Sequence, residues 1–272
     1  MYEAFYGFRE KPFHVTADPA FLFPSRHHQE ALAHLTYGIQ QRLGFLLITG
    51  EVGTGKTTLM KALVEKLHAP TRSALILNPT LSGTQLLRAI VQDFGILPGQ
   101  ALRPSTTRGE LLQAIEQFLL HQAASGGVGV LIIDEAQALS SGALEQVRLL
   151  STVETQKEKL LQIVLVGQPE LRLRLATESR LRALNQRIAV RYHIQPLSDE
   201  EVALYIDHRI RAAQGKRTLR FTEEAIARIT HVSQGVPRLI NLFCDQALLA
   251  GFVHESDVID ESMVSEIEGL HV

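Results

Sequence analysis

The sequence of 272 residues contains a single cysteine, Cys244, so no internal disulfide bond can form. CxxC motifs and paired cysteine and histidine spacings are absent too, and nothing indicates a structural zinc site of that kind. Long apolar runs are also missing: the longest, residues 43–48 and 128–133, fall far short of the roughly 20 residues that cross a bilayer. We therefore expect no transmembrane helix, no export signal and a reducing, cytoplasmic location.

The sequence also lacks an excess of charge of one sign. Its 27 Lys and Arg residues face 29 Asp and Glu residues, which gives a net charge of −2. No global field therefore indicates a nucleic acid or a basic partner, and partners have to be inferred from local features. Hydrophobic residues make up 45% of the chain and charged residues 21%, a composition typical of a globular protein with a buried core.

Short apolar runs alternate with longer amphipathic stretches as far as residue 195, a pattern typical of an α/β fold. The runs predict the strands of a mainly parallel five-stranded sheet at residues 45–49, 74–78, 130–134, 163–167 and 189–194. The last run alternates between apolar and polar residues, as an edge strand does. The stretches between the runs predict helices at residues 29–41, 56–67, 83–94, 109–123, 142–155 and after Pro169. The expected α/β fold is a three-layer sandwich.

The pattern changes near Pro196. Four amphipathic stretches follow it and predict helices at residues 199–213, 222–232, 237–253 and 261–270. Residues 196–272 carry 7 basic and 13 acidic side chains, whereas residues 1–195 carry 20 and 16. We therefore expect an α/β domain over residues 1–195 and an all-helical lid subdomain over residues 196–272.

A glycine-rich loop, GEVGTGKTT, follows the first expected strand and opens a helix. It has the spacing GxxxxGK[ST], in which backbone N–H groups and the helix N-terminus bind phosphate oxygens. The lysine reaches the β and γ phosphates, and the threonine hydroxyl suits Mg²⁺. A chance glycine-rich turn is the alternative, which the flanking strand and helix disfavour. The motif predicts a nucleotide-binding loop made of Gly50, Glu51, Val52, Gly53, Thr54, Gly55, Lys56, Thr57 and Thr58.

Two acids, Asp134 and Glu135, end the apolar run VLIIDEAQ. Acids at the end of a buried strand are costly unless a cation or a reaction uses them. Asp134 is placed to hold Mg²⁺ through water, and Glu135 to activate the attacking water. Taken alone, the two acids are equally compatible with a solvated strand end; beside the phosphate loop they predict nucleotide hydrolysis.

Further polar residues occur where ligands gather in α/β folds. Gln168 follows the strand at 163–167 and is expected to face the γ phosphate, with a solvent-facing glutamine as the alternative. Residues 172–191 contain six arginines and a single acid. Among them Arg187, just before the last strand, is expected to enter a neighbouring subunit's site. In the helical part, Pro237 and Arg238 begin a helix, and Arg238 is expected to bridge the lid to the γ phosphate.

Together these motifs resemble an AAA+ ATPase. The segments YEAFYGFREKPFHVTADPAFLFPSRHHQEALAHLTYGI, ILNPTLSGTQLLRAIVQDFG and VGQPELRLRL narrow the resemblance to the ExeA/GspA family, which includes exosortase-associated and pilus-associated relatives. The resemblance implies a ring-forming or otherwise oligomeric ATPase with ATP and Mg²⁺ as cofactors. It assigns nucleotide binding to Lys56 and Thr57, the Walker B roles to Asp134 and Glu135, the sensors to Gln168 and Arg238, and the trans finger to Arg187.

The finger is the least determined role, because Arg180, Arg182 and Arg191 compete with Arg187. The aromatic segment at residues 5–23 is expected either to cover adenine or to be core. Longer family members continue into a membrane helix and a periplasmic peptidoglycan-binding domain, which this sequence lacks. It is either a part of such a protein or a stand-alone ATPase, cytoplasmic or held at the inner face of the inner membrane.

Three functions are compared, and the first of them rests on the resemblance alone. The favoured one is assembly or remodelling of an envelope machine for secretion, pilus formation or polysaccharide export, with an envelope partner. The alternative is a DNA-associated ATPase, in which the arginine-rich stretch contacts phosphates, although no DNA-binding motif supports it. A small-molecule phosphotransferase is disfavoured by Glu135 and by the lid arginine.

Overall fold

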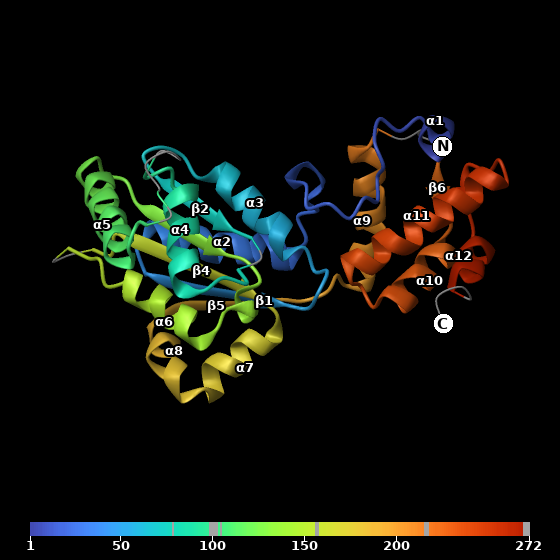
Figure 1. Ribbon diagram of the computed structural model, residues 1–272. Helices are drawn as coiled ribbons and strands as arrows, with labels where there is room; N and C mark the ends of the chain where they lie inside the picture. Colours follow the sequence, from blue (N-terminus) through green and yellow to red (C-terminus); the bar gives the residue numbers. More distant parts are fainter. Residues whose placement is uncertain (78, 98–102, 104, 156–157, 215–217, 269–272) are drawn as a thin grey trace. The chain divides into compact units, whose positions relative to one another are not determined.

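The computed structural model of the protein (Figure 1) describes residues 1–77, 79–97, 103, 105–155, 158–214 and 218–268. Its contacts divide the chain into two compact units. We call residues 29–51 and 60–194 the α/β unit, and residues 1–28, 52–59 and 195–272 the helical unit. Segments far apart in the sequence therefore pack together in the helical unit. The predicted division at Pro196 into an α/β domain and a lid subdomain stays a prediction.

Five strands form the sheet of the α/β unit, and every neighbouring pair is parallel. They are β1 (Phe45–Gly50), β2 (Arg72–Ile76), β3 (Gly129–Ile133), β4 (Leu161–Gly167) and β5 (Ile188–Ile194), in the order β2-β3-β4-β1-β5. The three central strands are buried throughout, whereas β5 alternates and lies at an edge, as predicted. Because the strands are parallel, their C-terminal ends share one border of the sheet, which we call the carboxyl edge; the opposite border is the amino edge.

Helices cover both faces of this sheet, as the three-layer prediction requires. They are α2 (Arg26–Gln40), α3 (Lys56–Lys66), α4 (Gly83–Asp93), α5 (Arg108–Ala124), α6 (Ser141–Leu150), α7 (Pro169–Thr177) and α8 (Arg182–Arg187), with the short 3₁₀ turns η2 (Ala136–Ala138) and η3 (Ser179–Leu181). Side chains of α4 to α8 share one core with Phe45 and Leu131 of the sheet. On the other face, α2 lies so close to Leu46 that a Cβ at Gly38 would meet its Cδ2 at 2.2 Å.

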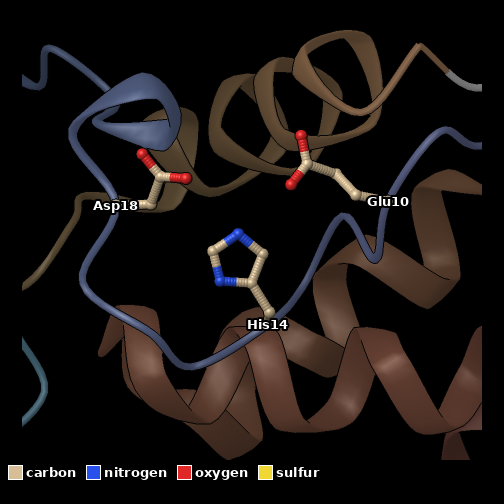
Figure 2. A group of neighbouring side chains, drawn as sticks. All are labelled: Glu10, His14 and Asp18. Atoms are coloured by element: carbon tan, nitrogen blue, oxygen red, sulfur yellow. The ribbon is translucent and has the colours of Figure 1, made fainter.

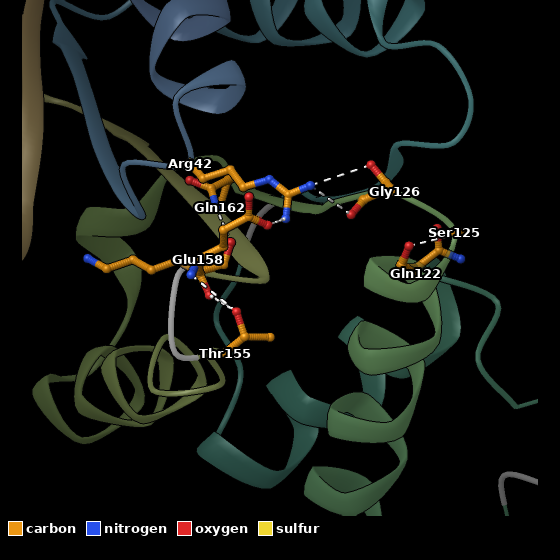
Figure 3. A network of polar contacts seen from close by, with 9 residues as sticks. Arg42, Gln122, Ser125, Gly126, Thr155, Glu158 and Gln162 are labelled. Atoms are coloured by element: carbon orange, nitrogen blue, oxygen red, sulfur yellow. Dashed lines mark hydrogen bonds and ion pairs between the residues drawn. The ribbon is translucent and has the colours of Figure 1, made fainter.

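Hydrogen bonds tie the loops of the amino edge to one another (Figure 3). Arg42, just before β1, forms an ion pair of 2.5 Å with Glu158 and donates to the carbonyl of Gly126 at 3.4 Å. The backbone N–H of Gly44 donates to Oε1 of Gln162 at 2.7 Å. These contacts join the entries to β1, β3 and β4, so the amino edge is a cross-linked border.

Four helices pack together in the helical unit: α9 (Asp199–Ala212), α10 (Glu223–Ser233), α11 (Pro237–Val253) and α12 (Glu261–Glu268). The N-terminal helix α1 (Tyr2–Tyr6) packs on α11. Most aromatic rings of the N-terminal segment are buried in the core of this unit: Tyr2, Tyr6, Phe8, Phe13 and Phe21. All of these except Tyr2 lie in the segment at residues 5–23 and are thus core, the second of the two roles considered for that segment.

The predicted architecture is confirmed, with local differences. The helix expected to reach Thr155 ends at Leu150, because the chain turns there through bonds from Ser151 and Thr152 to preceding carbonyls. The region expected to be all-helical also contains a two-stranded parallel pair, β6 (Arg220–Phe221) and β7 (Val258–Ile259). The expected elements ending at residues 78 and 270 have those ends outside the described residues. Among the described helices, none combines the length and apolar character needed to span a membrane.

Candidate functional site

Three neighbouring strands bring predicted site residues to the carboxyl edge. Gly50 ends β1 and opens the phosphate loop, Asp134 follows β3, and Gln168 follows β4. Asp134 is only 2% exposed. Its backbone N–H donates to the carbonyl of Ile76 at 2.9 Å, which extends the β2–β3 ladder by one residue. The backbone of Asp134 is therefore held at the edge by the sheet.

Glu135 leaves the strand in a left-handed conformation, with φ of 50°. Its backbone N–H donates to Oδ1 of Asp134 at 2.9 Å. Its carboxylate accepts hydrogen bonds from two side-chain amides, those of Gln137 and of Gln168, the latter at 3.1 Å. A positive φ is unusual for a residue with a side chain, and it turns the glutamate out of the strand direction.

Gln137 links these residues and was not singled out by the sequence. Its Oε1 accepts from the backbone N–H of Gln168 at 3.1 Å, which leaves its Nε2 to donate to Glu135. A Cβ at Gly167 would lie 2.7 Å from this Oε1, so glycine at that position makes room for the contact. The only signal in the sequence was that Gln137 comes two residues after Glu135, and hydrophobic periodicity does not show what such a residue contacts.

The phosphate loop has the backbone that its glycines predict. Gly53 and Gly55 have φ of 85° and 86°, a region that side chains disfavour. The carbonyl of Gly53 accepts from the backbone N–H of Arg238 at 3.2 Å, and the carbonyl of Gly55 accepts the first bond of α3, from Leu59. A Cβ at Gly53 would lie 2.6 Å from Cβ of Arg238. The helix α11 thus rests directly on the loop.

The carbonyl of Thr54, which lies between Gly53 and Gly55 in the loop, is bound by His28. Nε2 of His28 lies 3.0 Å from this oxygen, and Nδ1 lies 2.6 Å from Oγ of Ser25. The oxygen can only accept, so Nε2 carries the proton and the Ser25 hydroxyl donates to Nδ1. His28 is 5% exposed, and burial lowers the pKa of its imidazole. The sequence analysis missed this residue because it lies 26 positions before Thr54.

Pro237 and Arg238 occupy the first two positions of α11. Pro237 is buried, whereas the side chain of Arg238 is exposed. This helix has no side-chain cap at Val236, and the phosphate loop satisfies one of its free N–H groups instead. The helical unit therefore brings Gly53 and Arg238 together through backbone and Cβ, and the bridge from Arg238 to the γ phosphate stays a prediction.

Arg187 lies elsewhere. It is the last residue of α8 and is followed at once by β5, so it stands at the amino edge of the sheet. The seven residues of β5 place it roughly 20 Å from the carboxyl edge. Arg187 is exposed and donates to Oγ of Ser151 at 3.1 Å. It is not brought together with Glu135 or Gln168 of its own chain.

The competing arginines differ from Arg187 in their surroundings. Arg180 and Arg182 are exposed, in η3 and at the start of α8. Arg191 donates to the carbonyl of Asn185 at 2.6 Å. Arg174 donates to Glu178 at 2.7 Å and to the carbonyl of Gln137 at 2.7 Å. At least one of the six arginines therefore supports the fold behind Glu135.

The residues present fit a nucleotide with Mg²⁺. The positive φ angles of Gly53 and Gly55 and the engaged carbonyls of the loop are those of a phosphate-binding turn, and Lys56 is buried at the start of α3. The hydroxyl of Thr57 and the carboxylate of Asp134 are the oxygen donors that Mg²⁺ prefers.

Solved structures share this fold across most of the chain. The ORC2 protein of Aeropyrum pernix, solved as ADPNP–ADP complexes, matches with a TM-score of 0.71 and 18% identity over 95% of this chain and 71% of its own. The ORC1 protein of the same organism, in complex with DNA, gives 0.69 and 14% over 96% and 69%. The RuvB Holliday junction branch migration motor of Thermotoga maritima gives 0.57 and 16% over 89% and 68%. The protein thus has the nucleotide-binding fold of the AAA+ class.

The family follows from the sequence comparison. The AAA domain family matches residues 39–175, half of the chain, and the protein belongs to it. General secretion pathway protein A of Aeromonas hydrophila is 43% identical over 274 aligned positions, which cover 99% of this chain. Those positions cover 49% of that relative, so the chain spans about half of its length. The chain is therefore an AAA domain protein homologous to General secretion pathway protein A.

Proposed function

We propose that this protein is an oligomeric, magnesium-dependent ATP hydrolase that acts at subunit interfaces to assemble or remodel a bacterial envelope machine. The carboxylate of Glu135, held by two side-chain amides at the carboxyl edge, is the observation that carries the proposal. A carboxylate held in this way is suited to accept a proton from a water molecule aligned for attack on a phosphate.

The phosphate loop, residues 50–58, supplies binding. Its N–H groups and Lys56 offset the negative charge of the β and γ phosphates of ATP. Thr57 and Asp134 would hold Mg²⁺, which would neutralise negative charge that develops on the phosphates. Gly50 to Thr58 thus orient the substrate, and Glu135 supplies the base.

Gln168 and Arg238 respond to the nucleotide in this proposal. Gln168 donates to the same carboxylate oxygen of Glu135 that accepts from Gln137. A movement of the Gln168 amide would therefore change the hydrogen bonds that hold the Glu135 carboxylate. Arg238 lies in the first turn of α11, and its backbone N–H donates to the carbonyl of Gly53. A shift of the phosphate loop would therefore move that helix.

Arg187 supports an inter-subunit site. Its position at the amino edge keeps it away from Glu135 and Gln168 of its own chain, and its exposure leaves its guanidinium open to another copy. A planar guanidinium from a neighbour is suited to the charge spread over a transferring phosphoryl group. Homo-oligomerisation, in a ring or another arrangement, would complete the site.

The envelope role rests on the 43% identity to General secretion pathway protein A. We propose a cytoplasmic location, or one at the inner face of the inner membrane through an envelope partner or further sequence. Duplex DNA is the competing partner class, and the experiment below separates the two.

The test is the ATPase rate per subunit as a function of protein concentration, at moderate salt, with and without duplex DNA. A rate that rises with concentration and is indifferent to DNA is expected. Stimulation by DNA would move the function to a DNA-associated ATPase, and a rate independent of concentration would overturn the inter-subunit site. Absence of ATP hydrolysis under all conditions, with ATP still bound, would overturn the hydrolase itself.

A further inference from the structure

We propose that Glu10, His14 and Asp18 form a binding site for a divalent transition-metal ion, with zinc as the best match. The ATPase proposal uses none of these residues. Figure 2 shows the imidazole of His14 between the two carboxylates. One donor atom of each residue lies within 4.8 Å of the donors of the other two. All three belong to the segment that leads from α1 to α2 in the helical unit.

His14 provides the observation that points to a ligand. Both of its ring nitrogens are buried, and neither has a hydrogen-bond partner within the described part of the chain. Buried polar atoms of this kind are normally satisfied, because burying them unpaired is unfavourable. The ring packs edge-on against Phe21, with centroids 4.6 Å apart, and this contact holds it in place. A metal ion would occupy the position that one of these nitrogens and the two carboxylates face.

The backbone around the three donors is held in advance of any ion. Arg209 of α9 donates to the carbonyl of Pro12 at 2.6 Å and to that of His14 at 3.0 Å. Asp18 accepts from the backbone N–H of Ala20 at 2.9 Å and caps the 3₁₀ turn η1 (Pro19–Phe21). Because the loop is fixed on both sides of the site, little order has to be created when an ion binds.

The local charge also favours a cation. Glu10 and Asp18 contribute two negative charges, and Arg209 contributes one positive charge that faces backbone carbonyls and the ring of Phe21. The guanidinium therefore does not serve as the partner of the His14 ring. Glu10 is exposed, which gives an ion a route from solvent.

The donor set selects the kind of ion. One imidazole and two carboxylates leave room for a water molecule in a four-coordinate zinc site, whereas Mg²⁺ prefers oxygen donors alone. Zinc binds such donors at about 2.0–2.2 Å, so its tetrahedral ligands are about 3.4 Å apart. From spacings of up to 4.8 Å, closure on the order of 1 Å is needed, which side-chain rotation can supply.

An ion at this place would join residues 10 and 18 and stiffen the N-terminal segment on α9. That segment continues to His28, which is hydrogen-bonded to Ser25 and binds the carbonyl of Thr54 in the phosphate loop of the same unit. The ion would thus be structural, and magnesium used with ATP would not compete for it.

The experiment measures zinc binding to the full chain after removal of metals with a chelator, by competition with a chromophoric zinc chelator in the presence of excess Mg²⁺. His14→Phe keeps the packing against Phe21 and removes both nitrogens. Glu10→Gln and Asp18→Asn remove one carboxylate each, and the Asn side chain keeps an oxygen for the Ala20 cap. His121→Gln on the exposed surface of α5 is the matched control.

We expect one zinc ion per chain and a loss of about 100-fold or more in affinity for His14→Phe, with smaller losses for the two carboxylate variants. Zinc should raise the melting temperature of the parent chain and of His121→Gln, but not that of His14→Phe. Equal zinc affinity in the parent chain and His14→Phe would overturn the site. So would a loss confined to His121→Gln, or displacement of zinc by millimolar Mg²⁺.

Discussion

The α/β unit and the helical unit hold their candidate site residues in different ways. In the α/β unit, Glu135 and Gln168 stand at the ends of adjacent parallel strands, and the sheet itself brings them together. In the helical unit, the carbonyls of Gly53 and Thr54 are bound by Arg238 and His28, which come from remote segments. The residues proposed to carry hydrolysis are thus positioned by regular strand pairing, and the phosphate loop by tertiary contacts.

This difference has an energetic side. A strand end is held by many backbone hydrogen bonds, so losing one side-chain contact there leaves the position of Asp134 unchanged. The phosphate loop depends on a few single contacts, and the loss of one leaves a buried carbonyl unsatisfied. Substitutions in the α/β unit should therefore alter turnover, and substitutions around the loop should alter nucleotide affinity and stability.

Lys56→Ala should abolish ATP binding by the phosphate loop. The variant loses the cation that offsets the phosphate charge, so ATP affinity should fall below detection in a calorimetric titration. Lys66→Ala, in the last turn of the same helix, is the control. Retention of normal affinity by Lys56→Ala would refute the assignment of the phosphate loop.

Arg187→Ala should reduce turnover by roughly 10³-fold or more while ATP still binds, because a finger in trans acts on the transition state. Mixing it with Lys56→Ala, which retains the arginine but binds no ATP, should restore part of the activity. The ATPase rate as a function of the mixing ratio is the measurement. No recovery at any ratio would count against a shared site.

Glu135→Gln should bind ATP with parent affinity and hydrolyse it about 10²–10³ times more slowly, because an amide cannot accept the proton of water. Single-turnover hydrolysis with bound ATP measures the chemical step. Glu116→Gln, on the exposed face of α5, is the matched control. Turnover unchanged in Glu135→Gln would remove the glutamate as the base.

Gln137→Leu tests whether the amide pair orients that glutamate. The variant loses the donor to Glu135 and the acceptor for Gln168, and turnover should fall roughly tenfold at unchanged ATP affinity. Gln122→Leu, at the far end of α5, should leave turnover unaffected. Equal rates in the two variants would show that Gln137 only fills space.

His28→Ala should give the smallest and most pH-dependent effect. Burial lowers the pKa of His28, so the unfolded chain binds its proton more readily than the folded chain. The stability from the neutral imidazole is therefore full above pH 6.5, the ordinary value, and is lost as the pH falls from there through the folded pKa. The alanine variant should be about 1–3 kcal/mol less stable at neutral pH, with a smaller deficit in acid.

Urea unfolding of both chains between pH 5 and 8 is the measurement. The pKa of His208 is lowered by burial as well, so some acid destabilisation should persist in the variant. A deficit that stays constant across this range would contradict the role of the neutral His28.

Much of the fold was predictable from periodicity. The apolar runs that became β1, β3 and β4 could be buried only as central strands. The run that became β5 alternates between apolar and polar residues, because this edge strand is only partly buried. The phosphate loop was predictable because its chemistry is local: a strand, glycines, a lysine and a helix follow one another in the chain. The end of α6 was not, because bonds of Ser151 and Thr152 stop the helix before its apolar pattern ends.

By itself, the sequence determined which residues carry charge and where the backbone turns, and hence the loop at 50–58, Asp134, Glu135 and Gln168. Only the tertiary structure decided that Gln137 binds Glu135 and that His28 binds Thr54. It also decided that five N-terminal aromatic rings are core and that Arg187 stands at the amino edge. The physical reason is range: periodicity reports on neighbours along the chain, whereas these contacts depend on segments that meet only after the strands and helices have packed.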